Sequence, residues 1–262
     1  MEIVEIIFLS IIQGITEFLP ISSSGHLVLF SSLFLQEDHG MLFDISVHFG
    51  TLLAALIYFR SDLFNTFNDL QLRKTQTPSV KLFKNLLLAT LPILLIGYLL
   101  KEIIQNNLRM PAVIGWSSII FGILLYLTDR FKVKELKISE MNSSQSLFVG
   151  LCQCFALIPG ASRSGVAISA GLVIGLSRED ASRFSFLLAI PTIFFIAISS
   201  TFEVFLQPLE HDLISLFLGI LLSFATAYLT IDIFLKLIEK IGFLPFIIYR
   251  TILGFAVLIY LV

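Results

Sequence analysis

The chain alternates long apolar blocks with short charged connections. Three windows carry no charged residue over 19 positions each, namely Met110–Thr128, Phe184–Phe202 and Leu213–Ile231. A helix of that length crosses the hydrocarbon core of a bilayer. The pattern predicts an all-α polytopic membrane protein that forms one integral domain over residues 1–262. The apolar blocks cover approximately 1–35, 43–60, 85–100, 110–128, 146–177, 184–203, 213–233 and 243–262.

Basic residues concentrate in four of the connections. Five Lys and Arg lie in residues 60–84 and four in residues 130–137, while Arg178 and Arg183 follow the fifth block. The fourth basic region holds Lys236, Lys240 and Arg250 around the last connection. By the positive-inside rule these four regions are cytoplasmic. The connections at 100–111 and 203–212 together contain only two basic residues, so the same rule predicts that they face outward.

This orientation predicts that two of the blocks enter and leave the membrane on one side. Block 146–177 lies between two cytoplasmic connections, and block 1–35 precedes a helix that starts outside. Each is interrupted by proline and serine, and non-helical backbone at membrane depth is tolerated only inside protein or beside water. We expect about six full spans and two opposed re-entrant hairpins. The alternative is two full helices, or one long bent helix, in each block.

The two hairpin blocks share a sequence pattern. Residues 13–25 read QGITEFLPISSSG and residues 153–165 read QCFALIPGASRSG. Both run from glutamine through a short apolar stretch and a proline to a turn that closes in Ser-Gly. Because the copies have opposite expected orientations, the pattern indicates an inverted-topology repeat with halves of approximately 1–128 and 140–262. Broken helices of such repeats meet at the binding site of many transporters.

The first stretch carries polar chemistry at membrane depth. Gln13 and Glu17 share a helix face, and an intramembrane carboxylate indicates a function unless it serves as a structural partner for a cation. The turn at 22–25 can bind an anion through N–H groups and hydroxyls, or can simply cap a helix. His26 follows as a candidate general acid, base or nucleophile, or as a packing residue. The hydroxyls of the turn belong to Ser22, Ser23 and Ser24.

The second stretch supplies a cation. Arg163 is the one charged residue between Ser146 and Ser177. Its fork of donors suits phosphate, and the alternative is that it forms a buried ion pair with Glu17 and binds no phosphate. A carboxylate can hold a divalent metal, and a metal with an arginine can neutralise diphosphate oxygens. The residues therefore indicate phosphoryl transfer on a substrate that is reached through lipid and is itself a lipid.

At these residues the sequence resembles the undecaprenyl-diphosphate phosphatase family, which is associated with bacitracin resistance. The resemblance rests on GITEFLPISSSGH after Gln13, on PGASRSG from Pro159, and on FLPFIIYR near the end. It covers the whole chain. It implies hydrolysis of undecaprenyl diphosphate to undecaprenyl phosphate and inorganic phosphate, which recycles the lipid carrier of cell-wall synthesis. It also implies a divalent metal (Mg²⁺ or Ca²⁺) and a bacterial cytoplasmic (inner) membrane location with the site facing the outer side.

The resemblance also assigns residue roles. It implies Glu17 as the acidic motif residue, Ser23 as the nucleophile, His26 as the motif histidine and Arg163 as a phosphate ligand. A metal would be held by Glu17 and Gln13. The expected substrate contacts are Ser22, Ser24, Ser162, Ser164 and Gly165.

Two positions depart from the family pattern. Gln13 stands where many members have glutamate, so it brings an amide oxygen and no charge. Ala167 stands where the family often has threonine, so one hydroxyl is absent. Asp44 and His48, four residues apart at the start of a span, either line the site or only cap and pack, and Ser185 is a weaker candidate.

Other function classes are weighed against the phosphatase. A membrane transporter or polyprenyl-lipid flippase remains the alternative, since inverted repeats suit alternating access. The other membrane lipid-phosphatase family is excluded, because its motif needs an Arg-Pro dipeptide and the chain has none. A net charge of −2 suggests no nucleic-acid partner. A homodimer is left open.

Overall fold

The computed structural model describes residues 3–23, 25–27, 41–108, 110–131, 136–204 and 213–262. Within these ranges the chain forms helices, apart from one isolated β-bridge between Leu136 and Leu176. The α-helices are α1 (Ile3–Thr16), α3 (Met41–Tyr58), α4 (Arg60–Gln71), α5 (Pro78–Leu99), α6 (Lys101–Asn107), α7 (Pro111–Arg130), α8 (Ser143–Gln153), α9 (Arg163–Val173), α10 (Arg178–Val204), α11 (Leu213–Ile241) and α12 (Leu244–Tyr260). Two 3₁₀ turns are η1 (Ile138–Glu140) and η2 (Cys154–Leu157).

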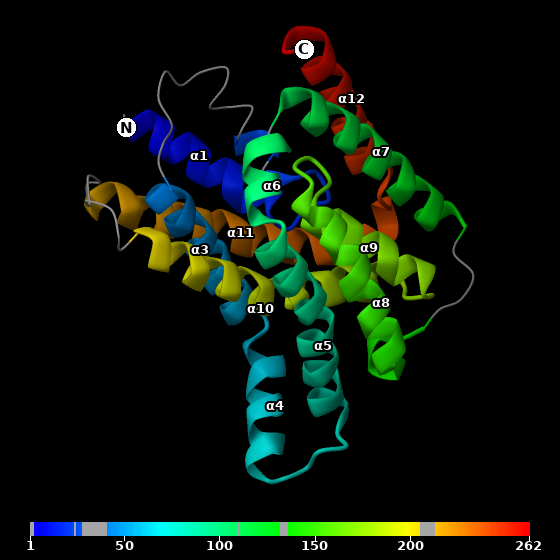
Figure 1. The fold of residues 1–262 in the computed structure, drawn as a ribbon. Helices are drawn as coiled ribbons and strands as arrows, with labels where there is room; N and C mark the ends of the chain where they lie inside the picture. The colour runs from blue at the N-terminus through cyan, green and yellow to red at the C-terminus, as the bar shows by residue number, and fades with distance from the viewer. Residues whose placement is uncertain (1–2, 24, 28–40, 109, 132–135, 205–212) are drawn as a thin grey trace.

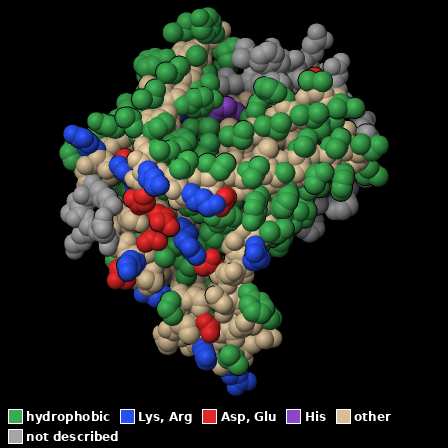
Figure 2. Space-filling view, turned by 180° about the vertical axis from the view of Figure 1, so that it is seen from behind, with side chains coloured by type: hydrophobic (Ala, Val, Ile, Leu, Met, Phe, Trp, Pro, Cys, Tyr) green, Lys and Arg blue, Asp and Glu red, His purple; other side chains and the backbone are tan. Residues whose placement is uncertain are grey.

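Five of the described helices are long and apolar enough to cross a membrane. They are α3, α5, α7, α10 over Arg178–Ser199, and α11. The prediction of an all-α chain with several membrane-spanning helices is confirmed. The exterior fits this, because hydrophobic side chains cover much of the face in Figure 2. Leu91 (60% exposed) and Leu95 (62%) of α5 belong to the apolar exterior.

The charged connections contain more helix than the hydropathy pattern predicts. Residues 60–84 were expected to be a loop, yet they contain α4 and the first turns of α5. Helix α5 begins at Pro78, where Thr77 Oγ1 accepts a hydrogen bond from Val80 N–H, and α10 begins at Arg178 instead of 184. These boundaries were wrong because hydropathy marks the apolar part of a helix, whereas charged turns continue the same backbone hydrogen bonding.

The long helices pack side by side through small residues. Helix α11 lies along both α1 and α3, α10 lies along α3, and α8 packs on α5 (Figure 1). At Gly50 the backbone of α3 approaches Ile220 of α11 so closely that a Cβ would collide with it. Gly150 of α8 meets Ala89 of α5 in the same way. Close approach of this kind is usual for helices packed within a membrane.

The core beneath the first helix break is aromatic. The ring of Phe18 contacts that of Phe186 edge to face at 5.2 Å between centroids, and Phe186 lies 5.4 Å from Phe234. Phe18 and Phe186 are completely buried. Because Phe18 directly follows Glu17, this packing fixes the backbone that carries the carboxylate.

Candidate active site

Both motif stretches break a helix in the same way. Helix α1 ends at Thr16, and Ser22 then adopts a left-handed backbone with φ of 74°. In the second stretch Ser162 has φ of 70°. In each case the serine Oγ accepts a hydrogen bond over 3.2 Å, from Gly25 N–H and from Gly165 N–H. A left-handed non-glycine residue is strained by roughly 1–2 kcal/mol, and the capping hydrogen bond offsets part of this cost.

The two breaks place matching positions at the starts of new helices. Ser23 follows Ser22, and Arg163 follows Ser162 as the first residue of α9. Ser164 Oγ also donates to the carbonyl oxygen of Leu19 over 2.8 Å, which connects the second break directly to the first. Helix starts carry unpaired N–H groups and partial positive charge, so two that lie together favour an anion.

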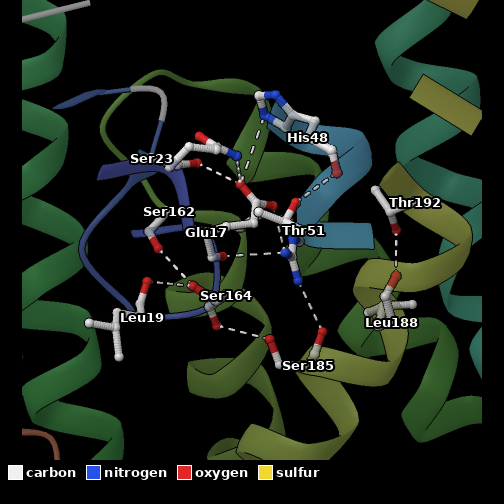
Figure 3. Close-up of polar contacts among 12 residues, drawn as sticks. Glu17, Leu19, Ser23, His48, Thr51, Ser162, Ser164, Ser185, Leu188 and Thr192 are labelled. Carbon is white, nitrogen blue, oxygen red and sulfur yellow. Dashed lines mark hydrogen bonds and ion pairs between the residues drawn. The ribbon is translucent and has the colours of Figure 1, made fainter. Parts of the chain in front are cut away.

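The described side chains converge on the Glu17 carboxylate (Figure 3). Arg163 Nη2 donates to Glu17 Oε1 over 2.8 Å. Ser23 Oγ and Gln13 Nε2 both donate to Glu17 Oε2, over 2.8 and 2.9 Å. Glu17 is 7% exposed and Arg163 12%, so this charge-assisted pair is largely buried. The structure therefore brings together four of the residues that the sequence singled out.

The remaining predicted contacts divide into three cases. Ser22 and Ser162 line the same cavity as Glu17. Ser164 is buried and does not line the cavity, and Gly165 contributes the N–H that Ser162 caps. Ser24 lies outside the described residues.

His48 is the histidine that faces the carboxylate. Its Nε2 lies 3.8 Å from Glu17 Oε2, and its Nδ1 bonds to the carbonyl oxygen of Asp44 over 2.7 Å (Figure 3). A carbonyl only accepts, so Nδ1 carries the proton and Nε2 points toward Glu17. Asp44 and His48 both line the cavity. The sequence signal was their spacing, because two residues four apart share one face at the start of α3.

His26 lies elsewhere. Its Nδ1 bonds to the carbonyl oxygen of Ser22 over 2.7 Å, and its Nε2 bonds to the hydroxyl of Tyr249 over 2.7 Å. The two rings are stacked, with centroids 5.6 Å apart. Both imidazole nitrogens are thus engaged in holding the first break against α12. The structure does not bring His26 to Glu17, and its catalytic role stays a prediction.

We expect His48→Leu to lower turnover by about 10²-fold, the lower end of what general acid–base catalysis contributes, because the His48 ring holds the Glu17 carboxylate in place for proton transfer. Tyr249→Phe removes only the hydroxyl bound to His26, so we expect a loss of at most a few-fold. Phosphate release by both variants under identical conditions measures the difference. A larger loss in Tyr249→Phe than in His48→Leu would contradict this order and favour His26 as the acid–base residue.

The structural role of Arg250 was not predicted from the sequence. The side chain is completely buried. Its guanidinium donates to the carbonyl oxygens of Ser118 (3.0 Å), Pro20 (3.2 Å), Gly160 (2.9 Å) and Ala161 (3.0 Å). One side chain of α12 therefore holds α7 and both helix breaks. The assignment of Arg250 to a cytoplasmic connection was wrong, because the residue lies inside α12; no run of apolar residues indicates which way a side chain points.

A cavity of about 480 Å³ opens at the side chains that meet on the Glu17 carboxylate. Its floor contains Glu17, Ser23 and Arg163, and its walls come from α3, α5 and α10. The walls are largely apolar, and examples are Ile93, Leu94, Ile193, Phe195 and Ile196. The arrangement suits a ligand with an anionic head and an apolar body.

Glu17, which lines the cavity, and Gln13, which is buried beside it, offer oxygen atoms that suit a hard divalent cation. Gln13 Oε1 is buried and has no hydrogen-bond partner among the described residues. It belongs to the amide that contacts Glu17. The described residues contain no cluster of three or more His, Cys, Asp or Glu side chains that could hold a metal. One carboxylate, one amide oxygen and phosphate oxygens from a substrate are nevertheless a ligand set that Mg²⁺ accepts.

Comparison with known proteins gives a consistent result over the whole length. Residues 6–256 match the family described as bacitracin resistance protein BacA. The chain is 45% identical to undecaprenyl-diphosphatase 1 of Pseudoalteromonas translucida, over all of this chain and 99% of the relative. It is 42% identical to undecaprenyl-diphosphatase of Alcanivorax borkumensis over the full length of both. It is 43% identical to undecaprenyl-diphosphatase 2 of Stutzerimonas stutzeri, over 99% of this chain and 98% of the relative. The chain belongs to the BacA family of bacitracin resistance proteins.

Proposed function

We propose that this protein is an undecaprenyl-diphosphatase. It removes the terminal phosphate of undecaprenyl diphosphate, which yields undecaprenyl phosphate and inorganic phosphate and confers bacitracin resistance. The observation that carries the proposal is the meeting of Ser23 and Arg163 on the two oxygens of one buried carboxylate, Glu17. A hydroxyl, a base and a guanidinium at one point are the groups that phosphoryl transfer needs.

The geometry supports a two-step displacement. In the first step Ser23 Oγ attacks the terminal phosphorus, its proton passes to Glu17 Oε2, and the bond to the lipid phosphate oxygen breaks. Glu17 then gives that proton to the departing lipid phosphate. In the second step a water attacks the phosphoserine, Glu17 takes the proton of the water, and Ser23 Oγ leaves with that proton. The starting hydrogen bond from Ser23 to Glu17 measures 2.8 Å.

Charge neutralisation comes from fixed groups. Arg163 Nη1 donates to the carbonyl oxygen of Ser185 over 3.0 Å, so the guanidinium is held while Nη2 faces Glu17 and the cavity. The capped starts of the two helices after the breaks add N–H dipoles. Glu17 and Gln13 would hold a divalent cation, which supplies further neutralisation of diphosphate oxygens when bound.

The proposal includes the membrane arrangement. Helices α1 and α9, with 14 and 11 residues, are shorter than the ~20 residues that a full span needs, which supports re-entrant hairpins. Helix α12 has 17 residues and would be the sixth span. The packing of α1 on α11 and of α8 on α5 is the relation expected between the two copies of an inverted repeat. The cavity would then open to the outer side of a bacterial cytoplasmic membrane.

Phosphate release by the purified protein in detergent tests this function. With a polyprenyl diphosphate and Mg²⁺ or Ca²⁺, we expect one phosphate per lipid and a fall of at least about 10²-fold with EDTA, because the metal supplies several kcal/mol of charge stabilisation. A lipid with a single phosphate serves as the control and is expected to release none. No release with any metal, from protein that retains its helical spectrum, would contradict the proposal and favour a transporter or flippase.

A further inference from the structure

Helix α4 has its polar and apolar faces reversed relative to a helix on a soluble protein. Its large apolar residues point outward, since Phe64 is 63% exposed, Phe67 58% and Leu70 42%. They recur every three residues and therefore form one stripe along the helix. In Figure 1 the helix projects, together with the start of α5, from the rest of the molecule. A stripe of this kind in water would be unfavourable by the usual hydrophobic cost.

The opposite face of α4 makes polar contacts with the protein. Thr66 is 9% exposed and its hydroxyl lies 3.4 Å from the carbonyl oxygen of Ser79. Ser79 Oγ in turn donates to Asp69 Oδ2 over 2.5 Å. Arg183 Nη2 donates to both oxygens of Asp62, over 2.7 and 2.9 Å. Each of these contacts turns the polar face inward.

A polar cavity of about 630 Å³ lies behind this face. It is bounded by α4, the start of α5, η1 and the start of α10, with Asn65, Asn68, Ser139 and Asp180 among its lining residues. A cavity with this many polar groups holds water. Helix α4 therefore separates a wet interior from an environment that accepts phenylalanine.

Cations stand at both ends of the apolar stripe. Arg60 begins α4, Arg73 and Lys74 follow its end, and all three are exposed. The two acidic residues of this segment, Asp62 and Asp69, are engaged by Arg183 and Ser79. Figure 2 shows lysine and arginine side chains beside hydrophobic ones at the projecting end. The outward surface thus combines apolar rings with positive charge.

The chain path keeps this surface next to the bilayer. Helix α3, which can span a membrane, ends at Tyr58, and α4 begins at Arg60. Helix α5 returns from Pro78 as another membrane-spanning candidate. A segment held between two spans at one end cannot lie far from the headgroups at that end. The basic residues of this segment assign that end to the cytoplasmic leaflet.

We propose that α4 is an interfacial helix bound to anionic lipid: Phe64, Phe67 and Leu70 insert among the acyl chains of the cytoplasmic leaflet, and Arg60, Arg73 and Lys74 contact lipid phosphates. Amphipathic helices with basic flanks bind anionic bilayers in this way. The polar face then forms the wall of a water-filled vestibule. This contact is independent of the phosphatase site.

Fluorescence quenching in the full-length protein tests the proposal. Cys152 and Cys154 are replaced by alanine, a single cysteine is introduced by Phe67→Cys or, as the matched control, by Asn65→Cys, and each is labelled with a small fluorophore. The protein is placed in vesicles of equal parts phosphatidylcholine and phosphatidylglycerol. Brominated acyl chains are expected to quench the label at position 67 at least about 3-fold more than the label at 65, with the reverse order for aqueous iodide.

The preference of position 67 for one lipid headgroup is measured in vesicles of the same headgroup composition, in which only one of the two lipids carries bromine. Bromine carried on phosphatidylglycerol is expected to quench position 67 more than bromine on phosphatidylcholine, and Arg73→Gln with Lys74→Gln should lower that preference about 5-fold or more. Iodide quenching of position 67 as strong as that of 65 would overturn the proposal and indicate a soluble partner surface. Disulfide-linked dimers of the unlabelled Phe67→Cys protein would overturn it in favour of a second copy. Phosphate release from the same samples reports folding and tests the proposed function separately.

Discussion

Replacement of Arg163 by methionine is expected to lower the turnover of polyprenyl diphosphate by about 10³-fold or more. An arginine that neutralises a transferring phosphoryl group is worth roughly that much or greater in other phosphoryl-transfer enzymes. Arg163 is the guanidinium on the cavity floor, and its Nη2 lies 2.8 Å from Glu17 Oε1. Methionine keeps most of the side-chain volume and removes the charge. Initial rates of phosphate release at saturating lipid measure the change.

A stability measurement separates chemistry from folding in this variant. Arg163→Met leaves the Glu17 carboxylate buried without its cation, which costs roughly 3–5 kcal/mol of stability. Adding Glu17→Gln removes the unpaired charge, so the double variant should recover most of its thermal stability in detergent and none of its turnover. Arg183→Met is the matched control, because Arg183 lies in α10 and pairs with Asp62 away from the cavity floor. Near-normal turnover in Arg163→Met would remove Arg163 from the site.

Ser23→Ala is expected to lower turnover by about 10³-fold or more, because the attacking oxygen itself is removed. Ser23 Oγ is bonded to Glu17 Oε2, which is placed to take its proton. A substrate that carries ³²P in its terminal phosphate should label the wild-type protein on brief mixing and should leave Ser23→Ala unlabelled. The label and the rate are measured on the same preparation.

The control for this variant is a serine of similar position and a different role. Ser169 Oγ donates to the carbonyl oxygen of Gly165 within α9, so Ser169→Ala changes a local helix contact and should retain turnover within a few-fold. If Ser23→Ala keeps near-normal turnover, attack by a water held near Glu17 replaces the serine mechanism. The role of Arg163 would be unaffected by that result.

Much of the candidate site could be predicted from the sequence because its parts are local. Gln13 and Glu17 are four residues apart on one helical stretch, and the structure confirms their contact at 2.9 Å. The shared Gln, Pro and Ser-Gly pattern predicted two comparable breaks, and Ser22 and Ser162 indeed share a positive φ of 74° and 70°. The pairing of Arg163 with Glu17, which spans 146 positions, was weighed only as the alternative to phosphate binding, because few other charges stand in the apolar blocks.

The histidines show where sequence reasoning ended. His26 follows Ser23 by three residues and was expected in the site, yet its ring is engaged by Ser22 and Tyr249. His48 was left undecided and lies 3.8 Å from Glu17. Residues three apart share one helix face, so the spacing placed His26 on the same face as Ser23 but could not show which partners would engage its ring. Only the packing of α3 and α12 against the first break decides which ring faces the carboxylate.

The sequence by itself determined that this protein is a helical membrane protein, which family it resembles, and which polar residues stand within its apolar stretches. Those features follow from hydropathy and from short motifs, and each is a property of neighbouring residues. The tertiary structure alone decided that Arg250 joins both helix breaks, that His48 faces Glu17, and that α4 presents its phenylalanines outward. These depend on side-chain directions across helices far apart in the chain, and such directions are set by packing, which no local pattern encodes.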